Sequence, residues 1–263
     1  MTVLGYLENL ASDLNIAEKE KGSIQTSISA LNSRLCKYFE DEIQGLIQFG
    51  SSTRNTMLPR KADSQSDIDY LVVFDSNYTP QAYLNKLKRF AEKYYSDSQY
   101  KQASPAVVLE LNHLMFDLVP GKKGWFGGYK IPTPGDFTFE EWKTTEPLSL
   151  NEEINDMNKL SGYKLKQTIR ILKYWNAKNN YVFTSFDLEQ MIVEHSTSIG
   201  GNLKDFLYEC IDIATYRPWG MPKKKKAKLR LLEEKGAFIK SMDEMGHPDE
   251  SLRELEKLFP QIE

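Results

Sequence analysis

The chain has 263 residues, enough for one large domain or two small domains in close contact, each with a hydrophobic core. Hydrophobic residues make up 40% of the sequence and charged residues 27%, which argues against a disordered, collagenous or fibrous protein. The 34 basic and 37 acidic side chains give a formal net charge of -3, so the chain has no global positive field for holding nucleic acid.

The N-terminal third of the sequence changes from a helical to a strand-like pattern. The first forty residues carry apolar side chains every three or four positions, which predicts one long helix, or two helices with a break near Gly22. Residues 45–49 then read as a short strand, and residues 53–66 as a polar loop. Residues 67–74, DIDYLVVF, are apolar and β-branched and predict a central strand.

The middle of the chain continues this mixed pattern before it becomes helical. Residues 79–95 begin with threonine before proline, which is typical of a helix start. Residues 107–111 and 114–119 are strand-like and close in sequence, which predicts an antiparallel hairpin. From Leu148 onward the pattern is helical, most clearly at residues 160–176 and 185–199.

These patterns together predict an α/β (α+β) protein with two parts. We expect residues 1–140 to form an N-terminal helix and a core with a mixed, twisted sheet and flanking helices. Residues 141–263 are expected to form a C-terminal helical lobe. The segment rich in glycine, proline and aromatic residues after Pro120 is the candidate crossing between the two parts.

Three aspartates are the candidate metal ligands. Because side chains alternate along a strand, Asp67 and Asp69 project from the same face, about 7 Å apart along the backbone. Asp117 lies in the otherwise apolar run LMFDLVP, where a buried charge needs a partner or a metal. If the two strands are neighbours, the three carboxylates converge and can hold one or two Mg²⁺ ions, with Mn²⁺ as an alternative. An isolated pair of aspartates in this spacing is more often a solvated strand end.

The glycine and serines that precede the loop add context to these acids. Gly50 follows a short apolar strand, where a glycine lets backbone amides come close to phosphate oxygens. The hydroxyl groups of Ser51 and Ser52 can bind the same anion. A glycine followed by serine is also a common turn, so this pair decides nothing alone.

The order of these motifs resembles the nucleotidyltransferase fold of the polymerase beta superfamily. Later segments narrow the resemblance to the cGAS/DncV-like nucleotidyltransferases of bacterial antiphage systems, relatives of oligoadenylate synthase and cyclic GMP-AMP synthase. The segments that carry it are Gly50-Ser51, Asp67-Ile68-Asp69, Asp117, Tyr129 to Pro132, Trp142, Pro147, Ile169 to Asn176 and Thr184 to Glu189. In place of the family's usual glycine-threonine pair, the loop has Asn55-Thr56.

The resemblance implies a role for each matching residue. Asp67, Asp69 and Asp117 would bind the metals, with Asp117 nearest the acceptor hydroxyl. Donor nucleotide contacts would come from Gly50, Ser51, Lys173, Ser185 and Phe186, the last by stacking on the base. From the residues alone, a solvated helix position is the favoured interpretation of Lys173, and a core position is an equal alternative for Phe186.

The expected activity is transfer of a nucleotidyl group from one NTP to a hydroxyl of a second nucleotide, giving a cyclic or short linear second messenger. The first alternative is a nucleotidyltransferase that modifies tRNA, a protein or a small molecule. The second is a catalytically silent nucleotide sensor, against which the presence of all three acids argues.

The sequence also predicts partners and location. We expect a monomer that uses NTP substrates and needs no nucleic-acid activator, with a downstream effector that binds the product and not this chain. The basic run Lys223–Lys226 is interpreted as a solvated helix face, with a nucleic-acid site as its alternative. Only two, widely separated cysteines, no signal-peptide pattern and no apolar run near 20 residues favour a soluble, cytoplasmic protein without membrane contact.

Overall fold

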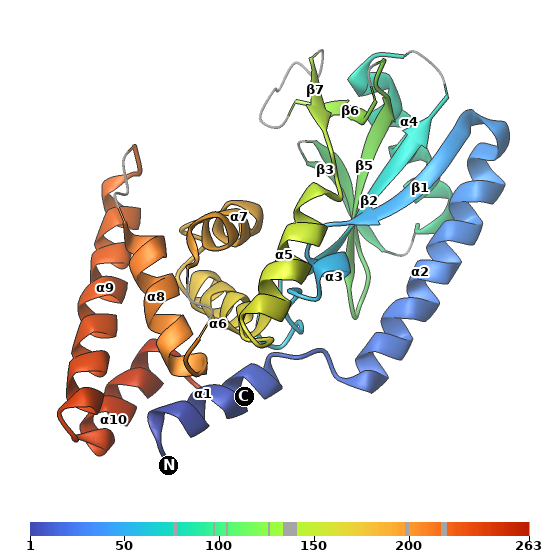
Figure 1. The fold of residues 1–263 in the computed structure, drawn as a ribbon. Helices are drawn as coiled ribbons and strands as arrows, with labels where there is room; N and C mark the ends of the chain where they lie inside the picture. Colours follow the sequence, from blue (N-terminus) through green and yellow to red (C-terminus); the bar gives the residue numbers. More distant parts are fainter. Residues whose placement is uncertain are drawn as a thin grey trace. The chain divides into compact units, whose positions relative to one another are not determined.

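The structure is a computed structural model that describes residues 1–75, 78–96, 98–103, 105–125, 127–133, 141–197, 200–216 and 220–262 (Figure 1). Its contacts divide the chain into two compact units, and each unit contains segments from distant parts of the sequence. The sheet unit comprises Ala17–Arg54 and Gln65–Ser149, and the helical unit comprises Met1–Ile16, Asn55–Ser64 and Leu150–Glu263. The two units are defined by contacts between residues, and such contacts do not test whether a segment folds independently. The expected domains, residues 1–140 and 141–263, therefore stay a prediction.

The sheet unit contains the mixed sheet that the sequence predicts. Its strands are β1 (Ile43–Phe49), β2 (Asp67–Phe74), β3 (Gln99–Ala103), β4 (Ala106–Glu110), β5 (Met115–Lys123), β6 (Tyr129–Pro132) and β7 (Trp142–Thr145). The main order is β1-β2-β5-β4-β3, and β6 and β7 extend from β5. β2 and β5 run parallel, whereas every other pair is antiparallel, so the predicted central strand and the β4–β5 hairpin are both confirmed.

One face of this sheet is covered by helices and the other carries the aspartates. The helices of this unit are α2 (Glu18–Phe39), η1 (Glu40–Glu42), α3 (Ser51–Arg54) and α4 (Pro80–Tyr94). Phe74 of β2 packs on Phe39 of α2 and on Tyr83 of α4, with ring centroids 5.1 and 4.7 Å apart. Because faces alternate along a strand, Asp67 and Asp69 point to the face opposite these two helices.

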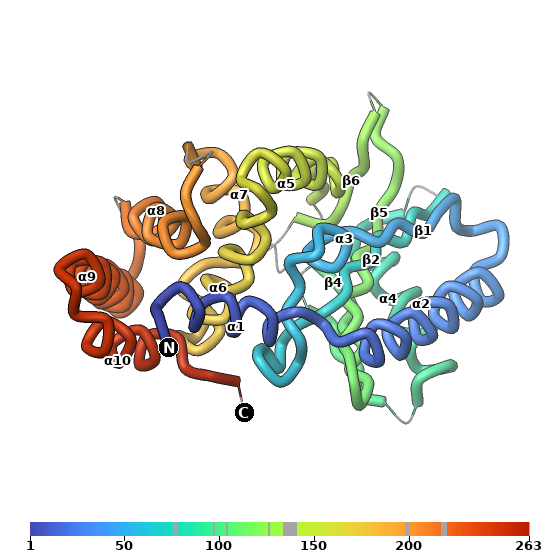
Figure 2. Tube along the Cα trace, turned by 60° about the horizontal axis from the view of Figure 1, so that its bottom comes forward, coloured from blue at the N-terminus to red at the C-terminus, as the bar shows by residue number. Residues whose placement is uncertain are grey.

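The helical unit contains α1 (Val3–Asp13), α5 (Ser149–Leu160), α6 (Leu165–Lys178), α7 (Ser185–His195), α8 (Leu203–Thr215), α9 (Lys223–Glu244) and α10 (Pro248–Leu258). Figure 2 shows α1 running beside α6 and α10, which are far from it in sequence. The buried Tyr6 hydroxyl donates to the carbonyl oxygen of Phe259, 2.6 Å away, and closes this arrangement. No helix in the described part of the chain is both long and apolar enough to cross a membrane.

Four expected boundaries are wrong. The first helix breaks between Asp13 and Glu18, whereas Gly22 lies inside α2. Glycine costs a helix only about 1 kcal/mol relative to alanine, which the buried face of α2 can offset. The expected loop at residues 53–66 begins with the last turn of α3.

The predicted helix at residues 160–176 is also two helices. It is interrupted at Gly162 and Tyr163, whose φ values of 59° and 66° lie in the left-handed region. The helix expected at residues 185–199 ends at His195 as α7, and residues 198 and 199 lie outside the described part of the chain.

Candidate active site

The three aspartates converge as expected. Asp69 of β2 lies directly opposite Asp117 of β5 in the parallel register, and Asp67 is two residues earlier on the same face. One carboxylate oxygen from each residue lies within 4.8 Å of the others, so the group could hold a metal ion. The pairing of β2 with β5 creates this site, because it brings residues about fifty positions apart in sequence to the same point of the sheet.

Gly50 lies directly against this acidic group. Its φ is +75°, a left-handed conformation that a residue with a side chain rarely adopts. A Cβ added to Gly50 would come within 1.8 Å of the Asp69 Oδ2 atom. The glycine after β1 is therefore required both by its backbone conformation and by the position of the Asp69 carboxylate.

Asp117 is the member whose surroundings fit a metal best. Burial raises the pKa of its carboxyl group above the usual value, and the positive charge of Lys101 partly offsets this effect. Its Oδ1 atom is buried and has no hydrogen-bond partner within the described residues. A buried carboxylate oxygen without a donor is costly, and a hard divalent cation is a ligand that would satisfy it.

Ser51 is buried at the start of the short helix α3, between β1 and the loop. The turn is held by local contacts, in which the Thr53 hydroxyl donates to the Gly50 carbonyl oxygen at 2.9 Å. The Ser52 hydroxyl accepts from the Gln48 amide at 3.0 Å and donates to the Phe49 carbonyl. Gly50, Ser51 and the acidic group thus belong to one ordered part of the sheet unit.

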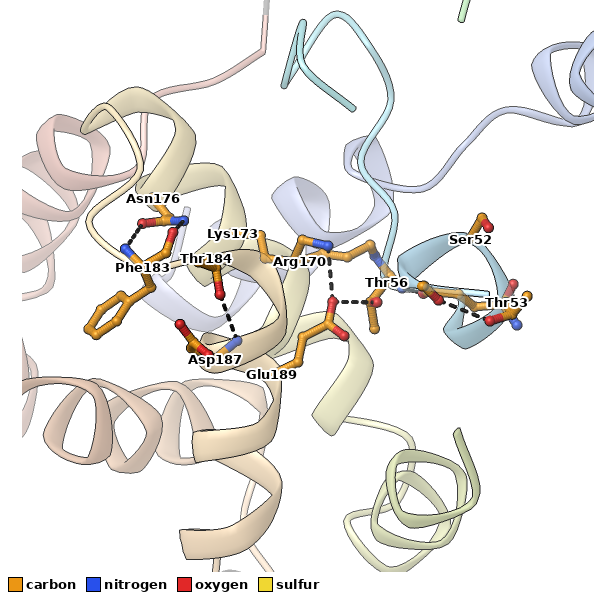
Figure 3. A network of polar contacts seen from close by, with 12 residues as sticks. Ser52, Thr53, Thr56, Arg170, Lys173, Asn176, Phe183, Thr184, Asp187 and Glu189 are labelled. Carbon is orange, nitrogen blue, oxygen red and sulfur yellow. Dashed lines mark hydrogen bonds and ion pairs between the residues drawn. The ribbon is translucent and has the colours of Figure 1, made fainter. Parts of the chain in front are cut away.

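Lys173 belongs to the helical unit, where it is buried and paired. The residue is 5% exposed, so the solvated alternative for it is wrong. Its Nζ atom lies 3.0 Å from Oε1 of Glu189, which is fully buried, and the hydroxyl of buried Thr56 donates to the same oxygen at 2.7 Å (Figure 3). This network joins α6, α7 and the segment after α3.

Ser185 and Phe186 form the first turn of α7. The hydroxyl of the preceding Thr184 caps this helix by accepting from the Asp187 amide at 3.1 Å (Figure 3). Phe186 is 49% exposed, so the core alternative for it is wrong. Both side chains are available for contact with a ligand, and their roles remain predictions.

The basic run on α9 is only partly a solvated face. Lys225 donates to the Val182 carbonyl oxygen at 2.8 Å, and Lys228 donates to the carbonyl oxygen of Asn179. Both acceptors lie in the connection from α6 to α7, which leads from Lys173 to Ser185. Lys223 and Lys224 are exposed, as the solvated interpretation predicts.

Glu189 and Thr56 are the polar residues whose position in this network the sequence did not reveal. A signal for Glu189 was present, because it falls among Leu188, Ile192 and Val193 on the buried side of α7. A carboxylate on an apolar helix face needs a cation or a hydrogen-bond donor. No comparable signal marks Thr56, whose contact with Glu189 spans 133 positions of sequence.

Comparison with known proteins identifies the family. Residues 1–158 match the model of the Second Messenger Oligonucleotide or Dinucleotide Synthetase domain. The chain belongs to this family. A curated relative, described as a probable cyclic nucleotide synthase of Bacillus cereus (strain VD146), is 28% identical over 189 residues. That match covers 57% of this chain and 55% of the relative, so the chain spans about half the length of the curated relative it matches.

Solved structures show that this synthetase family member has the fold of the cGAS/DncV-like nucleotidyltransferases. The Vibrio cholerae DncV cyclic AMP-GMP synthase in complex with the linear intermediate 5′ pppA(3′,5′)pG matches with a TM-score of 0.81 and 12% identity, over 99% of this chain and 97% of that one. The Bradyrhizobium diazoefficiens CdnG in complex with GTP matches with a TM-score of 0.71 and 10% identity, over 96% of each chain. A CdnE c-di-GMP synthase from Capnocytophaga granulosa matches with a TM-score of 0.65 and 19% identity, over 91% of this chain and 86% of that one.

These matches confirm the family resemblance and the predicted fold class. The mixed sheet, the acidic group at β2 and β5, and the helical C-terminal region all agree with that fold. The matched structures share less than a fifth of their residues with this chain, so they support the architecture and leave the individual site residues as predictions.

Proposed function

We propose that this chain is a metal-dependent nucleotidyltransferase that joins NTPs into a cyclic or short linear oligonucleotide second messenger. The observation that carries this proposal is the convergence of Asp67, Asp69 and Asp117 in a chain of the synthetase family. Three carboxylates on one sheet face repel each other, and this arrangement is expected to persist because a cation offsets that repulsion.

Mg²⁺, or Mn²⁺ in its place, would be held by these three carboxylates. When bound, such an ion clamps a donor triphosphate and makes a nearby hydroxyl easier to deprotonate. Asp117 is proposed to accept the proton of the acceptor hydroxyl on a carboxylate oxygen, because the resemblance places the third acid on the acceptor side. Gly50 keeps Asp69 in place, and the buried Ser51 is proposed to contact the donor triphosphate.

The remaining donor contacts are proposed for residues of the helical unit. Lys173 would bind the triphosphate as a compact positive charge, and Ser185 would add a neutral hydrogen bond. The exposed ring of Phe186 would stack on the donor base, which contributes about 1–3 kcal/mol without selecting one base. We further propose a cytoplasmic, monomeric enzyme of antiphage defence that needs no nucleic-acid activator and whose product binds a separate effector.

The direct test is mass spectrometry of the product formed from all four NTPs and Mg²⁺ without an added acceptor. The wild type is expected to form a linear or cyclic oligonucleotide and pyrophosphate, and Asp69→Asn to form none while keeping its fold. Asp75→Asn is the matched control, because Asp75 is an exposed carboxylate at the other end of β2. Turnover that persists in excess chelator would overturn the metal requirement.

The same assay separates the alternatives. Transfer only after addition of tRNA, protein or a small hydroxylated molecule would indicate a modifying nucleotidyltransferase. Binding of nucleotide without any pyrophosphate release, at all metal concentrations, would indicate a silent sensor.

A further inference from the structure

A second polar pocket lies within the helical unit, among α1, α5 and α6. Its volume is about 360 Å³, which is within the usual range of small-molecule sites. None of the residues assigned to the active site lines it. Its polar lining includes Ser12 from α1, Asn15 just after that helix, Asn158 from α5, and Lys166 and Arg170 from α6.

Arg170 is a buried cation with an unsatisfied hydrogen-bond donor in this pocket. The residue is 7% exposed, and its Nη1 atom donates to the backbone carbonyl oxygen of Asn55 at 2.9 Å rather than to a carboxylate (Figure 3). Its Nε atom is buried and has no hydrogen-bond partner among the described residues. A buried guanidinium normally lies against an anion, because desolvation of an uncompensated charge is costly.

The electrostatics of the pocket favour the binding of an anion. Burial lowers the pKa of the Arg170 guanidinium to about 10, so the group is still charged at neutral pH. Burial, together with the charge of Arg170, also lowers the pKa of the Lys166 amine. An anion bound beside Arg170 and Lys166 would stabilise the charged form of both side chains.

The rest of the lining suits a ligand larger than a bare ion. Asn15, Asn158 and Gln167 supply amide groups, and Tyr163 presents a ring that is 65% exposed. Glu8 is the one acidic side chain among the described lining residues, so the lining carries a net positive charge. Arginine and lysine with amide donors match the oxygens of a phosphate group.

We propose that this pocket binds the phosphate group of a small phosphorylated molecule through Arg170 and Lys166. The inference does not depend on nucleotidyl transfer, because every lining residue belongs to the helical unit and none is a proposed metal or donor ligand.

A ligand bound in this pocket would be linked to the proposed donor residues by a series of hydrogen bonds. Arg170 holds the carbonyl group of Asn55, and the next residue, Thr56, donates to Glu189, which pairs with Lys173 (Figure 3). An anion that fixes Arg170 would restrict the Asn55-Thr56 segment. This regulatory consequence, a lower KM for NTP, rests on the proposed function.

The test of binding uses thermal unfolding in chelator at constant ionic strength without NTP. Inorganic phosphate, adenosine 5′-monophosphate and citrate are titrated separately, so that free phosphate, a phosphate ester and a carboxylate are distinguished. We expect a saturable rise in Tm with the phosphate ester, and a smaller rise with inorganic phosphate. No saturable rise with either phosphate compound, or a larger one with citrate, would overturn the assignment.

The matched variants place opposite charges at one exposed position. Ser12→Glu is expected to weaken binding about tenfold and Ser12→Lys to strengthen it, because a charge at this lining position repels or attracts the bound phosphate. Lys166→Gln should also weaken binding, whereas Lys178→Gln on the same helix and Asp69→Asn should not. Equal affinity for the phosphate ester in both Ser12 variants, or loss of binding in Asp69→Asn, would contradict binding in this pocket.

The test of regulation measures the KM for NTP with and without the phosphate ester. The ester is expected to lower KM in the wild type, and to do so in Ser12→Glu only at about tenfold higher ester concentration. An unchanged KM with intact binding would reject the regulatory consequence alone, and a protein with no turnover but a saturable Tm shift would reject only the proposed function.

Discussion

Gly50 lies so close to Asp69 that no side chain at position 50 would fit beside the Asp69 carboxylate. The α-carbon of Gly50 faces the Asp69 carboxylate, and the distance that a Cβ would have to Oδ2 is 1.8 Å. The turn residue directly after β1 thereby leaves room for an acid on β2.

Gly50→Ala is therefore expected to lower turnover at least about 100-fold, because a shift near 1 Å in a reacting group has that effect. The positive φ should also cost about 1–3 kcal/mol of stability. Gly45→Ala, within β1 and with nothing within 4 Å of the added Cβ, is the control and should keep activity. Steady-state kinetics and urea unfolding of both variants check this, and wild-type turnover in Gly50→Ala would contradict it.

The buried pair of Lys173 and Glu189 predicts a non-additive result. Lys173→Met should destabilise the protein by about 3–5 kcal/mol, because it leaves a fully buried carboxylate without its cation. Adding Glu189→Gln should restore much of that stability, while the Thr56 hydroxyl keeps an acceptor. Urea unfolding of the single and double variants measures the coupling, and additive losses would refute it.

This coupling also decides how activity data on Lys173 are interpreted. Loss of turnover in Lys173→Met alone could come from damage to the buried network. Loss in a folded Lys173→Met, Glu189→Gln double variant, with Glu189→Gln as the control, would instead support a contact with the donor triphosphate.

The basic run on α9 should separate into two classes of lysine. Lys225→Ser and Lys228→Ser each remove a charged hydrogen bond to the α6–α7 connection, worth about 1.5–3 kcal/mol. Lys223→Ser and Lys224→Ser remove exposed charges and should have little effect on stability or turnover. Hydrogen exchange over residues 179–184 should rise only in the first class, and equal exchange in both classes would show that the contacts are unimportant.

The two cysteines should differ in reactivity toward a thiol reagent. Cys36 is exposed, whereas Cys210 is buried, and burial raises the pKa of its thiol despite a contact with the Ser196 hydroxyl at 3.9 Å. One thiol should react quickly in the native protein and the second only after denaturation. Cys36→Ser is the control, and rapid labelling of that variant would contradict the burial of Cys210.

Glu254 on α10 should contribute a pH-dependent part of the stability. Hydrogen bonds from Lys235 and Lys257 lower the pKa of its carboxyl group from 4.5 to about 2. Because the folded pKa is the lower one, the stabilisation is fully present above the unfolded pKa and is lost as the pH falls from about 4.5 toward 2. The stability difference between wild type and Glu254→Gln should shrink over that range, and a constant difference would refute the assignment.

The strands of the site could be predicted from the sequence because their signals are local. Residues 67–74 form β2 as expected, and the short gap after β4 places β5 correctly. β3 and β7 were missed because their sequences, QYKQA and WKTT, are mostly polar and pair at the sheet edges. Edge strands lack the apolar pattern that marks a buried strand.

Contacts between distant residues could not be predicted in the same way. The closeness of Gly50 to Asp69 depends on the β1–β2 register, and the pairing of Glu189 with Thr56 depends on how the helical unit packs. The break between α1 and α2 was placed wrongly because glycine is a weak local signal, whereas the side chains of α1 pack in the helical unit. Tertiary packing outweighs propensity at such positions.

The order of synthesis has a consequence for how this protein reaches its native state. The chain passes between the two units four times, and Tyr6 bonds to Phe259. The chain therefore has to be synthesised through Phe259 before the helical unit can close, and until then the apolar face of α1 stays uncovered. Fragments that start at residue 150, or that lack residues 1–16, should aggregate during expression, and co-expression of the missing N-terminal segment should rescue them.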